Sequence, residues 1–410
     1  MDPLINLFIR RNSFTTPKSY LQDFPLVGYI TDVNPNDIKL DISNETVDIL
    51  VDRGLYHTFN ELSYIYDEEK YREASAFVDP FFHADILWLK TFIAKKLATI
   101  DATTSFIGSS FPHSGNGGVN DTSVNEGSIN AYNGGYSTKG IYTTDTGIIS
   151  NEIGFKEINK NYAGNLTQII SGELKFICVN DTNGGYAEYL QKRLPESSGT
   201  ITCRNETGIT PGTLDPRRTK IIISDDRENN GFTIQDNKVN IITINYTGNR
   251  GQVWELIHDI ITGVRSLEIG GSIIVDSFEI HQQSFADVIF ILSLMFKNIT
   301  MFKSIGDLME NRTCTIVLRT FNGIGILEDI LTEIYNIDPD VGVTRLLSER
   351  SKQFDDFWIG SSNIVYQTII DRLLDIQKQL EVYPEQFNSK LSSTLDTSNF
   401  ASIIQMLNKM

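Results

Sequence analysis

Short apolar runs alternate with helical repeats through the middle of the chain. The run from Phe176 to Val179 is too short for a helix, and polar residues and two glycines follow it before apolar residues return at helical spacing. This pattern predicts a buried strand, a tight turn and a helix. Further strands are predicted at 220–224, 239–244, 272–275, 299–303 and 315–319, the last two as an antiparallel edge pair, with helices at 149–162, 252–269 and 284–296. Strands that alternate with helices indicate an α/β fold with a doubly wound, mostly parallel sheet.

Less regular segments flank this central part of the chain. Residues 84–100 carry apolar side chains at helical spacing and predict an amphipathic helix, as do residues 364–380. Residues 103–147 are rich in Gly, Ser, Asn and Thr, which predicts a surface insertion with too little apolar surface to order itself. These patterns divide the chain into an N-terminal extension at 1–100, an insert at 101–148, a central α/β domain at 149–325 and a C-terminal helical extension at 326–410.

The formal net charge of −17 over 410 residues narrows the range of partners. An acidic chain repels phosphate at long range, which argues against general coating of DNA or RNA, so that any RNA contact must be local. No apolar run is long enough to span a bilayer, and the first residues do not read as a signal peptide, so we predict a cytoplasmic protein without a membrane span. Cys178, Cys203 and Cys314 lack metal-ligand spacing and are typical of reduced core cysteines.

Two glycines follow the first strand of the central domain. Residues 180–185 read Asn-Asp-Thr-Asn-Gly-Gly, and the predicted helix opens at Tyr186. Gly184 and Gly185 let the backbone approach a ligand closely, and the N–H groups that open the helix can hold polar or anionic atoms. The turn is not the G-x-G-x-x-G fingerprint of dinucleotide sites, and a Gly-Gly pair after a strand is more often a plain turn. Its place after the first strand makes it the candidate ligand site.

Several segments, taken in order, resemble the FtsJ-type (RrmJ-type) ribose 2′-O-methyltransferases, specifically those that methylate the first nucleotide of capped mRNA. Residues 183–189, Asn-Gly-Gly-Tyr-Ala-Glu-Tyr, are similar to the family's Pro-Gly-Gly-Phe-Ser-Glu-Tyr turn. Residues 151–156 resemble its Asn-Arg-Ala-x-x-Lys helix, and residues 270–276 correspond to its Gly-Gly-x-Phe-x-x-Lys strand. The resemblance covers roughly residues 84 to 380 apart from the insert, and it rests on shared order and spacing.

The resemblance implies a Rossmann-like methyltransferase fold that binds S-adenosylmethionine at the first turn and delivers a methyl group to a ribose 2′-oxygen. The family uses a Lys-Asp-Lys-Glu tetrad, in which desolvation and a neighbouring cation lower the pKa of the central lysine. Lys156 matches the first lysine here, but Asn245, Asp276 and Thr313 stand at the other three positions. Asn245 lacks the carboxylate charge, and Asp276 would repel a developing alkoxide. The family's reaction is therefore not expected by the family's mechanism.

Carried over from the family, the cofactor turn consists of Asn180, Asp181, Asn183, Gly184, Gly185 and Tyr186. Asn183 replaces the family's proline, and Asp181 could either hydrogen-bond the methionine amino group of the cofactor or block its carboxylate end. Asp225 and Asp226 follow a strand where an acid that contacts adenosine would lie, although a double Asp there is also typical of a solvated turn. His281, five residues after Asp276, is a weaker candidate base, and the sequence shows no metal-ligand cluster or P-loop.

The leading hypothesis is a catalytically degenerate cap-ribose methyltransferase homologue that serves as a binding or assembly module linked to mRNA capping. Its expected partners are capped RNA, a capping enzyme or another protein, and not DNA. The alternative is an active S-adenosylmethionine-dependent 2′-O-methyltransferase with a rearranged site, and a third reading is an α/β protein of unrelated function. A bias towards Asn, Ile, Lys and Asp suggests an AT-rich genome, such as that of a large DNA virus that replicates in the cytoplasm, with a viral factory or the virion as the location.

Overall fold

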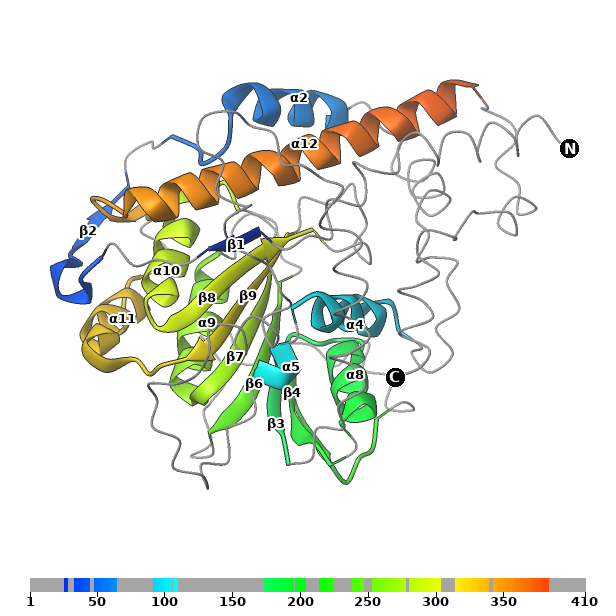
Figure 1. Ribbon diagram of the computed structural model, residues 1–410, viewed down its shortest axis with the longest axis vertical. Helices are drawn as coiled ribbons and strands as arrows, with labels where there is room; N and C mark the ends of the chain where they lie inside the picture. The colour runs from blue at the N-terminus through cyan, green and yellow to red at the C-terminus, as the bar shows by residue number, and fades with distance from the viewer. Residues whose placement is uncertain are drawn as a thin grey trace, which may run out of the picture.

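The structure is a computed structural model. It describes residues 26–28, 33–44, 48–64, 91–104, 106–109, 173–194, 196–203, 214–223, 238–246, 253–277, 280–303, 314–338 and 342–382. Residues 110–148 of the insert and the helix predicted at 149–162 lie outside these residues. The first residues of the insert are helical, because one helix runs over Phe92–Thr104, across the predicted boundary, and a short one over Phe106–Ser109. The described part has a twisted mixed sheet with helices on both faces and one long helix near the C-terminus (Figure 1).

The central sheet has eight strands in the order β1-β8-β9-β7-β6-β3-β4-β5. The six predicted strands correspond to β3, β5, β6, β7, β8 and β9. β6 is buried along its whole length, as expected for a strand in the middle of a parallel sheet. The bounds of the strands are β1 Leu26–Gly28, β3 Lys175–Val179, β4 Ser198–Cys203, β5 Thr219–Ile223, β6 Val239–Asn245, β7 Leu267–Ser277, β8 Phe296–Phe302 and β9 Cys314–Phe321.

The strand order reverses at β3. From β3 the chain continues to β4 and β5 on one side and then crosses to β6 and β7 on the other, and all five strands are parallel. The carboxyl ends of β3 and β6 therefore flank the reversal point, which is where ligands bind in open α/β sheets. β8 and β9 pair antiparallel as predicted, but they are not the edge of the sheet, because β9 lies against β7 and β1 adds to β8.

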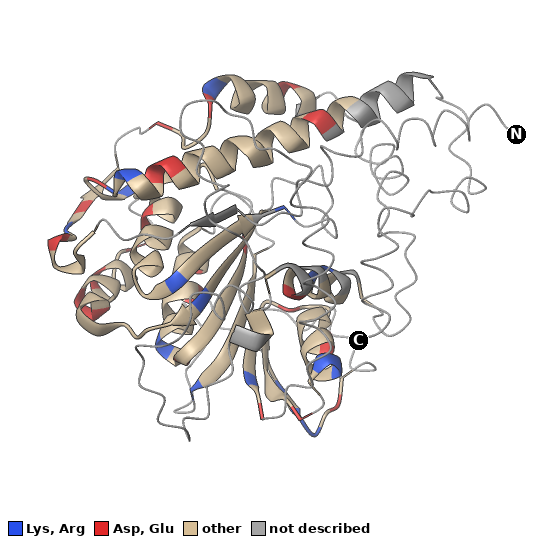
Figure 2. Cartoon of the chain, in the orientation of Figure 1, with Lys and Arg blue, Asp and Glu red and all other residues tan. Residues whose placement is uncertain are grey.

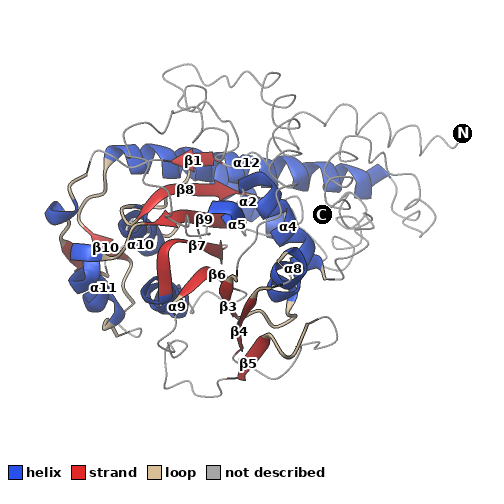
Figure 3. Ribbon diagram, turned by 60° about the horizontal axis from the view of Figure 1, so that its bottom comes forward, coloured by secondary structure: helices blue, strands red, loops and turns tan. Residues whose placement is uncertain are grey.

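Helices cover both faces of the sheet. Figure 3 shows α4 and α8 on one side and α9 and α10 on the other. A second, two-stranded sheet pairs β2 with β10. The helices are α2 Arg53–Tyr64, α4 Phe92–Thr104, α5 Phe106–Ser109, α8 Gly185–Arg193, α9 Val253–Ser266, α10 Gln283–Ser293, α11 Glu328–Tyr335 and α12 Lys352–Val382, with β2 at Leu40–Ser43, β10 at Arg345–Leu347 and short 3-10 turns η2 at Pro35–Asp37 and η5 at Gly325–Leu327.

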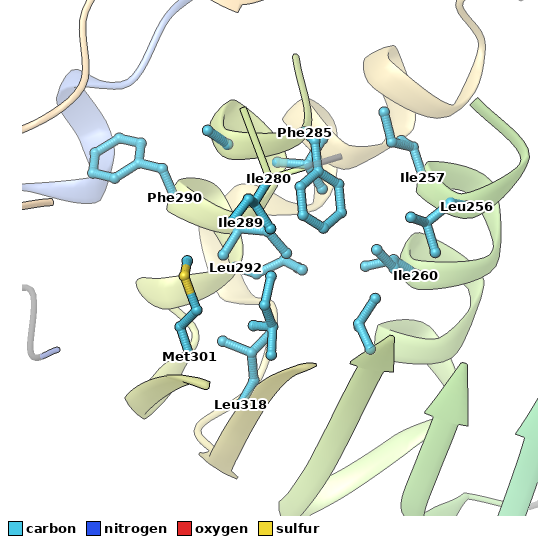
Figure 4. Packing of buried hydrophobic residues seen from close by; sticks show 14 of the residues in the cluster. Leu256, Ile257, Ile260, Ile280, Phe285, Ile289, Phe290, Leu292, Met301 and Leu318 are labelled. Carbon is cyan, nitrogen blue, oxygen red and sulfur yellow. The ribbon is translucent and has the colours of Figure 1, made fainter. Parts of the chain in front are cut away.

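Each face of the sheet has its own apolar core, because neighbouring residues in a strand point to opposite faces. On β7, Ile273 belongs to the core under α9 and α10, whereas Ile274 belongs to the core under α4, α5 and α8. Figure 4 shows the first of these cores, where Ile257 and Ile260 from α9 face Phe285 and Ile289 from α10. Burial on both faces explains why the central strands are mostly apolar and do not alternate between apolar and polar residues.

A buried carboxylate ties the C-terminal elements to the sheet. Asp287 on α10 is fully buried, and its Oδ2 accepts hydrogen bonds from the N–H groups of Leu346 (2.7 Å) and Leu347 (3.2 Å). Its Oδ1 accepts from Nη1 of Arg350, just before α12. Burial raises the pKa of Asp287, and Arg350 opposes that rise. The helix predicted at 364–380 therefore continues back to Lys352, where this anchor holds it.

Charged residues occur mainly on the helices and connections of the described chain, and Lys and Arg are spread over several elements (Figure 2). None of the helices in the described parts of the chain has the length and apolar character needed to cross a bilayer.

Candidate functional site

The turn between β3 and α8 has the backbone shape of a ligand-binding turn. Asn180 follows β3 with φ at 57°, and Gly184 comes just before α8 with φ at 65°. Asn and Gly are the residues that adopt this left-handed region most readily, which explains why the sequence breaks its apolar run with them. The chain passes from the end of β3 to the start of α8 within six residues, so the N-terminus of α8 lies beside the carboxyl end of β3, at the point of the sheet where open α/β folds have their ligand crevice.

The two glycines are required by packing within the chain. A Cβ on Gly185 would lie 2.7 Å from Oγ1 of Thr91 and 2.8 Å from Cβ of Ile93, where the start of α4 crosses α8. A Cβ on Gly184 would lie 3.0 Å from Cδ1 of Leu214. Gly185, which the sequence offers for close approach of a ligand, is therefore needed for close approach of α4, whereas Gly184 is favoured by its left-handed backbone.

Asp181 occupies the N-terminus of α8. Its side chain has no exposed surface, and its Oδ2 accepts a hydrogen bond of 3.1 Å from the N–H of Ala187. Burial raises the pKa of Asp181 to about 6, although the N–H groups of Ala187, Tyr186 and Gly185 oppose the rise. The second oxygen, Oδ1, has no hydrogen-bond partner within the part of the chain that the structure describes. A buried acceptor of this kind needs a donor from elsewhere or a proton of its own.

Asparagine side chains connect the ends of β3 and β6. Nδ2 of Asn245 donates to the main-chain oxygen of Asn180 at 3.4 Å, and Nδ2 of Asn180 lies 3.5 Å from Oδ2 of Asp259 on α9. Asn245 and Asp259 are both buried. At the tetrad position that the family fills with aspartate, Asn245 thus holds the neighbouring turn in place and carries no charge.

Asp276, at the carboxyl end of β7, is the centre of a buried polar cluster. Nζ of Lys96 on α4 lies 3.1 Å from its Oδ2, and the hydroxyl of Tyr186 donates to the same oxygen. The hydroxyl of Thr315 on β9 donates to Oδ1 at 2.7 Å. Asp276 and Lys96 have 5% and 6% of their side-chain surface exposed, so this ion pair is shielded from water. Both carboxylate oxygens are therefore used within the chain.

Lys96 is the functional candidate that sequence reasoning missed. The structure brings its Nζ within 3.1 Å of Asp276, the residue that aligns with the central lysine of the family that the sequence resembles. One signal was present, because Lys96 lies four residues before Ile100, next to the apolar stripe of its helix. A lysine beside such a stripe is unusual unless it is paired.

A polar network also joins α4 to α8. Oε2 of Glu188 accepts from the N–H of Thr91 at 3.3 Å, and the hydroxyl of Tyr189 donates to Oδ2 of Asp101 at 2.8 Å. Nε of Arg193 lies 3.6 Å from that oxygen. Burial raises the pKa of Asp101, and Arg193 and Tyr189 oppose the rise. These contacts hold the helix that carries Lys96 against the helix that opens the crevice.

The remaining candidates are only partly placed. Lys156, Thr313, Asp225 and Asp226 lie outside the described residues, so their predicted roles stay predictions. Asn183 is exposed at the tip of the turn, and Tyr186 points its hydroxyl at Asp276 as described above. His281 lies beside Tyr366, with Nδ1 3.0 Å from the tyrosine hydroxyl, at the junction of α10 with α12. Among the described residues, no group of His, Cys, Asp and Glu side chains is arranged to hold a metal ion.

No family model matches the chain, and no curated protein matches it. Solved structures that align with it include precorrin-6y C5,15-methyltransferase from Geobacter metallireducens, at 13% identity and a TM-score of 0.26 over 43% of this chain and 91% of that one. TrmN from Thermus thermophilus aligns at 12% identity and a TM-score of 0.28 over 39% of this chain and 48% of that one. Human methyltransferase-like protein 13, in complex with SAH, aligns at 11% identity and a TM-score of 0.27 over 40% and 79%. Scores this low carry no argument about function.

The class of the protein follows from its own sheet. Five parallel strands in the order β5-β4-β3-β6-β7, with antiparallel β9 between β7 and β8, form a Rossmann-like α/β sheet of the methyltransferase type. This confirms the fold predicted from the sequence. A fold of this class hosts many functions, so the activity has to be argued from the crevice.

Proposed function

We propose that this protein is a catalytically degenerate homologue of the cap-ribose 2′-O-methyltransferases, retained as a binding or assembly module linked to mRNA capping. The observation that carries the proposal is the buried ion pair between Asp276 and Lys96. In the family's mechanism the same place requires a lysine with a lowered pKa. Here a carboxylate stands there, and it forms an ion pair with Lys96.

Methyl transfer to a ribose hydroxyl needs a group that removes the proton and a positive field for the oxygen as it becomes nucleophilic. Lys96 and Asp276 cancel each other's charge, and the hydroxyls of Tyr186 and Thr315 already donate to Asp276. Asn245 adds no charge at the end of β6. A substrate hydroxyl would therefore meet no free base and no net positive field from these residues, which supports loss of the reaction.

The β3–α8 turn still fits part of S-adenosylmethionine. Oδ1 of Asp181, which has no partner among the described residues, could accept a hydrogen bond from the amino group of its methionine moiety. Oδ2 already accepts a hydrogen bond from the N–H of Ala187 in the first turn of α8. When bound, this cofactor supplies an electrophilic methyl group. Asp181 would hold the amine end, and Asn180 and Asn245 would shape the crevice beside it.

Capped RNA or a capping enzyme is the proposed partner, with a cytoplasmic or virion location that follows the composition of the chain. The test is a transfer assay of the full chain with tritiated S-adenosylmethionine and RNA whose cap lacks 2′-O-methylation. We expect no transfer above the blank. Transfer that Lys96→Met abolishes and the matched control Lys192→Met preserves would overturn the proposal, provided that both variants unfold cooperatively.

That overturning result would establish the second candidate, an active 2′-O-methyltransferase with a rearranged site. The position of Lys96 favours this candidate, because a buried lysine does reach the carboxyl end of β7. Substrate would then displace Asp276 from Lys96, and the lysine would be free to act. In that case Lys156→Ala should leave transfer intact, since Lys96 supplies the cation.

A further inference from the structure

Ile269 and Ile326 are the most exposed large apolar side chains in the part of the chain that the structure describes. Their exposed fractions are 65% and 57%, whereas the others do not exceed 46%. Ile269 lies near the start of β7 and Ile326 lies in η5 after β9, so both belong to the end of the sheet opposite the crevice. A Cβ on Gly323 would lie 3.3 Å from Cδ1 of Ile269, which places the two segments side by side. Single exposed apolar residues are ordinary, but two on adjoining segments form a patch, which we call the amino-end patch.

An irregular stretch of β7 presents Ile269 to solvent. Val239 of β6 pairs with Leu267, and Ile241 pairs with Ser272, so two steps along β6 correspond to five along β7. The extra residues of β7 form a bulge between these two pairs. Bulges bend a strand and redirect its side chains, and they are built features of a sheet rather than frayed ends.

The backbone on both sides of Ile269 is fixed by contacts within the chain. Nδ2 of Asn240 on β6 donates to Oε2 of Glu268 at 3.2 Å. Gly270 has φ at 86°, which few other residues adopt, and a Cβ on Gly271 would lie 2.8 Å from the main-chain oxygen of Asn240. Ile269 nevertheless belongs to neither apolar core. The bulge therefore holds an isoleucine where it stabilises the fold little.

The segments beside the amino-end patch are acidic. α11 begins two residues after Ile326 and contains no Lys or Arg (Figure 2). Exposed carboxylates on α11 and on η2, which lies against η5, are Asp37, Glu328, Asp329 and Glu333. The cations on adjoining segments are Lys39, Lys238 and Arg265, of which Arg265 pairs with Glu328 at 2.8 Å. With Glu268 included, the acids outnumber the cations, so the surface around the patch is negative.

We propose that the amino-end patch is the docking surface for a short segment of another protein, in which apolar residues are flanked by Lys or Arg. The two isoleucines supply apolar contact area, and the carboxylates of α11 and η2 attract the flanking cations. A second copy of this chain is a poorer occupant, because it would bring the same acidic surface and a net charge of −17. The same charge disfavours RNA and anionic lipid surfaces.

This surface is separate from the crevice. Asp276 and the β3–α8 turn lie at the carboxyl ends of the parallel strands, whereas Ile269 lies at the other end of β7. The inference therefore goes beyond the proposed function, because it does not depend on cofactor binding or on the loss of methyl transfer. It adds the side of the sheet from which a protein partner approaches.

The test is selection from a display library of random short peptides on the full chain and, in parallel, on the double variant Ile269→Ser with Ile326→Ser. Both side chains are mostly exposed, so the variant should unfold at the same urea concentration as the parent. Peptides enriched only on the parent should carry net positive charge and several large apolar residues. In calorimetric titration, a synthetic copy of such a peptide should bind the variant about tenfold to 100-fold more weakly.

Two further variants separate the apolar and charged contributions. Ile359→Ser with Ile364→Ser removes two exposed isoleucines from α12 and should not change binding of the peptide. Asp329→Asn with Glu333→Gln should weaken binding by about threefold to tenfold at low salt and by less at high salt, because salt screens exposed charges.

Equal binding to the parent and the Ile269→Ser/Ile326→Ser variant would overturn the inference, as would a selection that yields no peptide dependent on the two isoleucines. Selected sequences that are acidic or uncharged would also overturn it. A dimer of the parent in sedimentation velocity, lost in the variant, would assign the patch to a second copy instead. None of these results bears on the transfer assay with capped RNA, which tests the proposed function separately.

Discussion

Replacing Asp181 by asparagine should stabilise the protein at neutral pH and leave its stability nearly unchanged in acid. Asparagine keeps the shape of the side chain and an oxygen that can accept from the N–H of Ala187, but it removes the buried charge. Burial is the main cause that raises the pKa of Asp181 from 3.8 to about 6. The negative charge of Asp181 therefore destabilises the folded state.

The sign follows from linkage between protonation and folding. Below pH 3.8 the carboxyl of Asp181 is protonated in both states, and its contribution to stability is fully present. As the pH rises through about 6, that contribution is lost, because the unfolded chain ionises more easily. A difference of about two pKa units corresponds to about 3 kcal/mol. Asp181→Asn should therefore raise the free energy of unfolding by up to about 3 kcal/mol at pH 8.

Urea unfolding of both proteins between pH 4.5 and 8 measures this difference. Burial also raises the pKa of Asp101 and Asp287, but both proteins contain these groups, so their contributions to the difference in stability cancel. Asp215→Asn provides a control of opposite sign, because the N–H of Arg217 and the side chain of Arg218 lower the pKa of Asp215. That variant should lose stability near neutral pH and match the parent protein in acid. A gain for Asp181→Asn that is absent at pH 8, or the same at every pH, would refute the reasoning.

Three other substitutions test the packing and ion pairs. Gly185→Ala should lower the free energy of unfolding by about 1–3 kcal/mol, because its Cβ would lie 2.7 Å from the nearest side-chain oxygen; an unchanged urea midpoint would contradict this. Lys96→Met should cost about 3–5 kcal/mol by leaving Asp276 buried without its cation, and adding Asp276→Asn should recover part of the loss in a double-mutant cycle. Arg350→Met should lower the free energy of unfolding by a similar amount, because Asp287 would stay buried without its cation. Thermal unfolding measures this loss, and a loss below about 1 kcal/mol would count against the anchor.

The parallel core of the fold could be predicted because its strands are buried on both faces. Residues 176–179 are an unbroken apolar run and residues 239–244 are mostly apolar, and they appear as β3 and β6 with nearly the predicted bounds. The apolar pattern does not predict β4, because its sequence, Ser-Gly-Thr-Ile-Thr-Cys, mixes small and polar residues. Its Gly199 is needed for space, since a Cβ there would lie 2.4 Å from the ring of Phe176. A glycine that reads as a turn signal in the sequence is here a packing requirement across two strands.

The helix predicted at 252–269 shows a different limit. α9 ends at Ser266, and the chain enters β7 at once, so Ile269 belongs to a strand. Gly270, the residue after the predicted helix, lies inside that strand with φ at 86°. Local periodicity continues through the boundary because both elements are apolar, and pairing with β6 decides where the helix ends.

The candidate site was predictable in its position but not in its contacts. The turn at 180–185 was identified because a ligand edge follows from strand order. The contact between Lys96 and Asp276 could not be predicted. This pair joins α4 to the carboxyl end of β7 and depends on how α4 crosses α8 at Gly185. Contacts of this kind depend on tertiary packing, which spacing along the chain does not encode.

The residues around Asp276 and those around Asp181 differ in how completely the chain satisfies its own polar groups. This difference supports the proposal that methyl transfer was lost while ligand binding was kept. Around Asp276 every carboxylate oxygen has a donor from the chain, so a substrate hydroxyl would have to break an existing bond to enter. At Asp181 one buried oxygen is left without a donor among the described residues. A reacting site must keep its key groups available until substrate arrives, whereas a binding site needs one group that only the ligand completes. The first condition fails at β7 and the second is met at β3, which agrees with the proposal that this methyltransferase fold lacks transfer activity and keeps a ligand site.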